Sequence, residues 1–223
     1  MTKKPSTFLR IVTIVFLSLT AAMTLLGAIG TTCVAFNAEQ YGPSMAALVP
    51  VKPIFQLLVF VSLAAGLFGV YSIVRLARGR KNSYNHVLIF LVVGLVASAV
   101  QFYYSLTLRG STAPNNMRLY LTGLTLVLFL LLRLPGLWRR TGFDRDGSNP
   151  GQPRAEGMAL FLCGLVTITT PVWAKPTHFI DGANTANVLL LPLLASGAIM
   201  MLLGGIKFVN WKLLWEKLGF STN

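Results

Sequence analysis

Residues 11–32 read IVTIVFLSLTAAMTLLGAIGTT and contain no charged side chain. An α-helix rises about 1.5 Å per residue and a bilayer's hydrocarbon core is about 30 Å thick, so about 20 apolar residues are needed to cross it. This run is long enough. It also exceeds the apolar core of about 7–15 residues in a typical signal peptide, although Cys33-Val34-Ala35 could pass as a cleavage site. We therefore expect a retained first transmembrane helix.

Five more apolar runs follow, and together the six predict an all-α fold. The expected spans are residues 11–32, 54–74, 86–108, 118–137, 158–175 and 186–206. Proline interrupts the last two, at Pro171 and Pro192, and the fifth is short, so five spans is the main alternative. Proline is tolerated in a membrane helix where neighbouring groups satisfy the freed carbonyl. The sequence predicts a polytopic integral membrane helix bundle with six transmembrane helices.

The composition supports a membrane protein. The chain has 223 residues, of which 54% are hydrophobic and 11% charged. A typical soluble domain has about 25% charged residues. With fewer than half that share, a soluble chain of this size would have too few polar side chains to cover its surface. These values exclude an ordinary cytosolic enzyme. The chain has two cysteines, and this number is too small for a disulfide-rich secreted scaffold.

The basic residues predict the orientation, because Lys and Arg are retained on the cytoplasmic side of a membrane. With six spans, all of the 19 basic residues except Lys52, Arg109, Arg118 and Lys175 fall on the side of the two termini. Both termini are then cytoplasmic (N-in and C-in), in a multi-pass protein of the cytoplasmic or plasma membrane. The net charge of +13 is explained by this orientation and by attraction to anionic lipid headgroups on the cytoplasmic side. We expect no nucleic-acid partner.

Two segments outside the spans have informative patterns. Residues 139–157 are rich in Gly, Pro, Asp and Arg, which is typical of a solvated linker, here a cytoplasmic loop. Residues 207–220 place apolar side chains, including Trp211 and Trp215, at spacings of three or four. That spacing predicts an amphipathic interfacial helix. Docking against a partner subunit is the alternative role for this helix.

The sequence predicts no catalytic, metal or cofactor site. Cys33 and Cys163 fall at different depths of their spans, whereas a disulfide needs Cα atoms within about 7 Å. His86 and His178 fall at opposite faces, so they cannot ligate one haem or one zinc ion. None of the six acidic residues lies within a predicted span. This distribution argues against proton pumping and ion-coupled transport.

Polar side chains within the spans gather toward the predicted outer face. The deepest is Gln101, whose amide would cost several kcal/mol if left unpaired in hydrocarbon. The sharper of two hypotheses is a ligand-binding polar pocket open to the outer side. Its predicted members are Gln101, Tyr104, Arg109 and Arg118, with Glu39 or Asp181 as counter-charge. The alternative is ordinary solvation of helix ends combined with hydrogen bonds between helices.

Three classes of function fit these observations. The first is a non-catalytic accessory or scaffold subunit of a membrane complex, with protein partner subunits or a second copy of the chain. The second is a small transporter or channel for a neutral or lipid-like solute. The third is an enzyme acting on lipid or quinone at the outer leaflet, where Arg109 and Arg118 would bind phosphate and Glu39 or His178 would act as base. The missing catalytic groups and the small loops favour the first.

Overall fold

The computed structural model describes residues 6–134, 136–143, 152–174, 179–180 and 183–208. Most of this part consists of six apolar helices. They are α1 (Thr7–Asn37), α3 (Lys52–Ala77), α4 (Ser83–Arg109), α5 (Asn115–Leu131), α7 (Gln152–Ala174) and α8 (Leu190–Phe208). Five of them are long and apolar enough to cross a membrane, and α5, with 17 residues, is shorter. The predicted all-α, multi-pass membrane bundle is confirmed.

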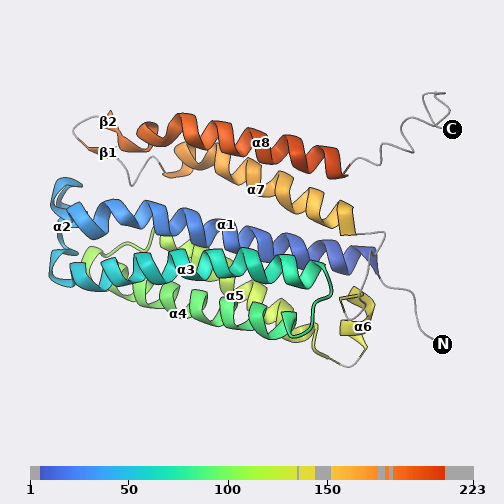
Figure 1. Cartoon of the computed structure of the whole chain (residues 1–223). Coiled ribbons are helices and arrows are strands. Elements are labelled where there is room, and N and C mark those ends of the chain that lie inside the picture. Colours follow the sequence, from blue (N-terminus) through green and yellow to red (C-terminus); the bar gives the residue numbers. More distant parts are fainter. Residues whose placement is uncertain (1–5, 135, 144–151, 175–178, 181–182, 209–223) are drawn as a thin grey trace.

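The helix α1 is central to the bundle (Figure 1). It packs against α3 and α5 on one side and against α7 on the other, while α4 packs on α3 and α5, and α8 packs on α7. Successive long helices run in opposite directions, so the start of α1 and the end of α8 lie at the same end of the bundle (Figure 1).

Short elements mark the two ends of the bundle (Figure 1). One end, here named the α2 end, carries η1 (Ala38–Gln40), α2 (Pro43–Ala46), η2 (Val49–Val51), the antiparallel strands β1 (Phe179–Ile180) and β2 (Ala183–Asn184), and η4 (Thr185–Leu189). The other, the α6 end, carries α6 (Leu137–Thr141). The sequence predicts that the α2 end is the outer one.

The helix α5 differs from the span predicted at residues 118–137. It begins at Asn115 and ends at Leu131. The chain then turns through Gly136, which lies in the left-handed region with φ 87°, and forms α6. Hydropathy extended the predicted span across the turn as far as Leu137, because leucines continue on both sides of it. Proline and glycine at residues 135 and 136 favour a turn over a continuous helix.

Two other predicted boundaries also shift. The linker expected at residues 139–157 is helical at both ends, in α6 and in the first turns of α7. A helix can continue beyond its apolar part, and Glu156 of α7 pairs with Lys207 of α8 at 3.2 Å. Of the amphipathic helix predicted at residues 207–220, the first two residues belong to α8, and the rest lies outside the described residues.

The start of α5 lies deep in the bundle. The Asn115 side-chain amide donates to the backbone carbonyl of Ser98 at 3.0 Å. Ser98 is about three turns from the end of α4 at Arg109, which is about 16 Å along the helix axis. Residues 110–114 therefore descend beside α4 before α5 begins, and this explains why α5 is short. Non-helical backbone at membrane depth is tolerated only where protein buries it or where it lines a cavity.

Two apolar clusters fill the bundle, one toward each end. The cluster toward the α6 end includes Leu17, Phe90 and Phe129, and the cluster toward the α2 end includes Met45 and Phe55. Buried polar side chains from four helices lie in the layer between them: Thr20, Thr24, Ser62, Ser98, Gln101, Arg118, Thr122 and Thr125. A polar layer therefore crosses the middle of the bundle.

The helices α7 and α8 meet through glycines spaced seven residues apart in each helix. A Cβ atom on Gly197 would lie 2.8 Å from the Gly164 carbonyl oxygen. A Cβ atom on Gly204 would lie 2.7 Å from the Gly157 carbonyl oxygen. Only glycine allows backbones to approach this closely, as in other small-residue contacts between membrane helices. This contact holds α8 to the rest of the protein, because α8 packs chiefly on α7.

Candidate functional site

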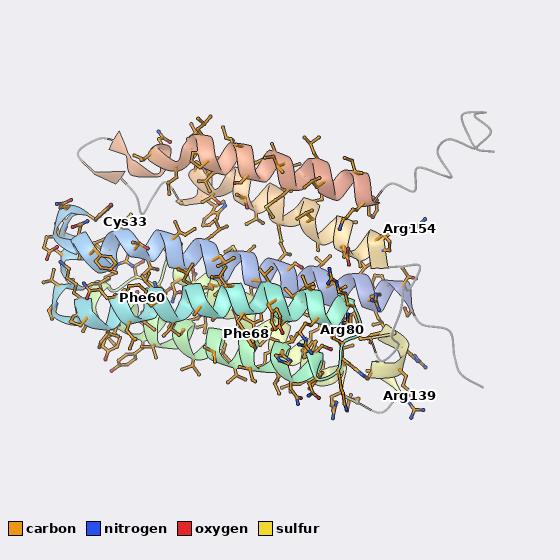
Figure 2. All side chains as sticks on the ribbon, viewed as in Figure 1. Cys33, Phe60, Phe68, Arg80, Arg139 and Arg154 are labelled. Atoms are coloured by element: carbon orange, nitrogen blue, oxygen red, sulfur yellow. The ribbon has the colours of Figure 1, made fainter. Side chains whose placement is uncertain are left out.

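A cavity of about 150 Å³ lies in the half of the bundle toward the α2 end. Helices α1, α4, α5, α7 and α8 and the segment around α2 contribute to its wall. Its polar lining includes Thr31, Gln101, Ser105, Arg109, Asn115 and Arg118. Cys33 also lines it, and Figure 2 shows this residue on α1 toward the α2 end, on the side of α7 and α8.

Arg118 is the most buried charged group on the cavity wall. The residue is 3% exposed. Its Nε donates to the Ser98 hydroxyl at 2.8 Å and its Nη1 donates to the Ser62 hydroxyl at 3.3 Å. Nη2 is buried and has no hydrogen-bond partner among the described residues. Because Ser62 and Ser98 are near the middles of α3 and α4, this guanidinium lies deep within the bundle rather than near one of its two ends.

No carboxylate in the described part of the chain neutralises Arg118. The acidic residues of that part are Glu39 and Glu156. Glu39 pairs with Lys52 at 3.1 Å and Glu156 pairs with Lys207 at 3.2 Å. A charged side chain inside a membrane protein is costly and usually paired or functional. Among the described residues, the guanidinium therefore has no counter-charge and lacks one hydrogen-bond acceptor. A bound anion would supply both.

Arg10, near the α6 end, provides a contrast. It is 1% exposed, and its Nη2 donates to the Ala77 carbonyl at 2.7 Å and its Nη1 to the Thr141 carbonyl at 3.3 Å. These carbonyls belong to the last residues of α3 and α6, where a helix dipole favours a positive charge. Arg118 instead lies in the first turn of α5, where the dipole favours a negative one. The bundle thus stabilises Arg10 more fully than Arg118.

Gln101 and Arg109 share the cavity with Arg118. The Gln101 amide, which is 8% exposed, donates to the Thr31 hydroxyl at 2.8 Å. Arg109 is half-buried, and its contacts with the Ser44 hydroxyl and the Ala113 carbonyl are long, at 3.4 Å each. Arg109 therefore lies nearer the α2 end with a weakly held guanidinium, and Arg118 lies deeper in the bundle.

Two other predicted site residues, Tyr104 and Glu39, are not among the residues that line this cavity. Tyr104 packs against the apolar cluster at the α2 end, and Glu39 is exposed and paired with Lys52. Asp181 lies outside the described residues. Sequence reasoning missed Asn115, and it placed Arg118 toward the outer face rather than deep in the bundle. The stretch Pro114-Asn115-Asn116, two residues before Arg118, was the available signal.

The lining groups suit anion binding. Arginine, amide and hydroxyl groups donate hydrogen bonds, and charge-assisted bonds to an anion are the strong ones. Burial, together with the neighbouring Cys33 thiol, raises the pKa of Tyr41, another lining residue, to about 12, so its hydroxyl stays protonated at neutral pH. In the described ranges, no group of three His, Cys, Asp or Glu side chains is placed to hold a metal ion.

In comparisons with models of known protein families, with curated proteins and with solved structures, nothing matches this chain.

Proposed function

We propose that this multi-pass membrane protein is a non-catalytic binding protein whose cavity holds the negatively charged group of a ligand. The observation that carries the proposal is Arg118, which is buried on the cavity wall without a carboxylate partner in the described part and with Nη2 unpartnered. A guanidinium left with an unmade hydrogen bond in a low-dielectric site is costly. An anion in the cavity would supply both the missing acceptor and the counter-charge.

The start of α5 supports the same proposal. Its N-cap residue, Pro114, provides no side-chain hydrogen bond to the first turn, and both Pro114 and Asn115 line the cavity. The positive end of a helix dipole favours an anion, and this is the part of the helix start that supports binding, since the Asn116 and Met117 N–H groups already donate to the Thr112 carbonyl and to the Asn116 side-chain oxygen. Arg118 and the helix start therefore favour the same charge at the same place.

Binding is favoured over the other two classes of function. The apolar cluster around Phe90 and Phe129 fills the bundle between the cavity and the α6 end, which supports binding rather than passage across the membrane. No carboxylate or imidazole of the described residues lines the cavity, which supports binding rather than acid–base catalysis. A binding protein of this kind can serve as the accessory subunit that the sequence favours.

We also propose that the α6 end faces the cytoplasm. Figure 2 shows Arg80, Arg139 and Arg154 at the end opposite Cys33, in agreement with the positive-inside rule. A chain with Cys33 and Cys163 replaced by serine, and with one new cysteine introduced, tests this orientation. In intact cells, a membrane-impermeant maleimide should label Ser44→Cys at the α2 end. Lys81→Cys should react only after permeabilisation, and the reverse pattern would invert the orientation.

The anion proposal predicts that inorganic phosphate stabilises the purified protein through Arg118. At a concentration about 100 times the dissociation constant, binding adds about 2.7 kcal/mol, which for this chain length corresponds to a rise in Tm of roughly 5–10 °C. Arg118→Gln removes the charge and should abolish the rise. The measurement is Tm in neutral detergent against phosphate concentration, with chloride at equal ionic strength.

Two variants control this experiment. Arg133→Gln removes a cation at the α6 end and should leave the phosphate effect intact. Gly27→Ala is the milder test, because its Cβ would lie 3.1 Å from the Cδ and Nη1 of Arg118. This variant should displace the guanidinium and so reduce the phosphate-dependent rise in Tm. Equal phosphate stabilisation of the wild-type protein and Arg118→Gln, or none of the wild-type protein, would refute the proposal.

A further inference from the structure

We infer that the ligand is an anionic lipid, which enters the cavity sideways from the bilayer with its charged headgroup at Arg118 and its chain along an apolar wall of α1, α7 and α8. The inference rests on the proposed function and adds the class of ligand and its route. A phosphate or carboxylate on a hydrocarbon chain has the required chemistry.

The size of the cavity limits what it can enclose. Its volume of about 150 Å³ is several times the roughly 30 Å³ that one water molecule occupies in the liquid. A phosphate or carboxylate fits this space, whereas a whole lipid does not. The apolar remainder of a lipid must therefore lie outside the enclosed part.

An apolar wall leads from the cavity to the surface of the bundle. Ile29 of α1, Trp173 of α7 and Leu189, which precedes α8, line the cavity. The same three residues are 48%, 38% and 43% exposed. In a membrane, such exposed apolar surface faces lipid chains. The wall is thus continuous from the charged floor of the cavity to the surrounding hydrocarbon, as a lipid headgroup with an attached chain requires.

The arrangement of the helices agrees with a lateral entrance. Both α5 and α7 pack on α1, but they make few or no contacts with each other. The cavity lies between them, since Asn115 and Arg118 of α5 and Thr170 and Trp173 of α7 belong to the same lining. The ligand can enter where the two helices separate.

The two arginines provide a graded path for a headgroup. Arg109 is half-buried at the end of α4, with long hydrogen bonds that are easily released. Arg118 lies about three turns deeper, beside Ser98. A headgroup from the leaflet at the α2 end would meet Arg109 first and Arg118 next. A soluble anion would use the charges but leave the apolar wall unused, so the lipid should bind more tightly.

The test uses Trp173 as a reporter in the full chain, with Trp138, Trp211 and Trp215 replaced by phenylalanine. Lipids with brominated chains quench a tryptophan that they contact. At equal mole fractions in mixed micelles, brominated phosphatidic acid should quench Trp173 with an apparent affinity at least about tenfold higher than brominated phosphatidylcholine. Arg118→Gln should reduce this preference to within about twofold. Arg109→Gln, at the more exposed position, should reduce it about threefold.

The matched control is a chain whose single tryptophan is Trp138, near the α6 end. Arg118→Gln should not change the relative quenching of Trp138 by the two lipids. Equal quenching of Trp173 by both lipids in the wild-type background would overturn the lipid inference, whatever the variants do. If phosphate still raises Tm through Arg118 in that case, the proposed function stands and the ligand is a soluble anion. If phosphate has no Arg118-dependent effect either, both proposals fail.

Discussion

Gly204→Ala is expected to lower the free energy of unfolding by about 2–3 kcal/mol, the upper part of the range for overpacked sites. A Cβ atom on Gly204 would lie 2.5 Å from the Phe161 backbone nitrogen and 2.7 Å from the Gly157 carbonyl oxygen. Both neighbours are backbone atoms, so no side chain can rotate away. The helices α7 and α8 must separate, and the packing between them is weakened along its length.

Gly205 provides a matched control, because a Cβ atom there would meet nothing within 4 Å. Gly205→Ala should leave the stability within about 0.5 kcal/mol or raise it slightly through better helix propensity. The measurement is unfolding of the purified protein in mixed micelles, followed by circular dichroism. Similar losses for the two neighbouring variants would show that general helix effects, rather than the glycine contact, determine the result.

Much of the fold could be predicted from the sequence, because a bilayer requires long apolar helices and the chain shows them plainly. The error concerned α5. Hydropathy reports how apolar a stretch is, but not the depth at which a helix starts. Asn115 bonds to the Ser98 carbonyl, a contact between α5 and the middle of α4 that no local pattern encodes. The sequence therefore placed Arg118 near a membrane surface, whereas the structure places it near the middle of the bundle.

The candidate site was predicted in part. Three of the residues expected to gather toward one face, Gln101, Arg109 and Arg118, line the same cavity in the structure. Glu39 was expected as a counter-charge, but Lys52 lies closer and satisfies it. The apolar wall joins α1 to α7 and α8, and such pairings across the bundle depend on packing rather than on local sequence. The seven-residue spacing of glycines in α7 and α8 was a readable signal for a different contact, the one between these two helices.

Ser62→Asp is expected to abolish anion binding while stabilising the protein without ligand. The Ser62 hydroxyl lies 3.3 Å from the Nη1 of Arg118, so a carboxylate at this position would sit next to the guanidinium. It would supply the counter-charge that the described part of the chain lacks, and a ligand anion would then be repelled. We expect phosphate affinity to fall at least about 100-fold, since a close pair of like charges in a poorly solvated site costs several kcal/mol. The measurement is the phosphate-dependent shift in Tm.

Ser62→Asn separates charge from size, because asparagine has nearly the shape of aspartate without its charge. It should retain phosphate binding within about tenfold and should not raise the Tm of the ligand-free protein. If Arg118 needs a counter-charge, the aspartate variant alone will gain stability and lose the phosphate response. Equal behaviour of the two variants would mean that the volume at this position matters and the charge does not. Arg118 would then be a structural residue like Arg10, held by its hydrogen bonds to two serines, and the cavity would need another explanation.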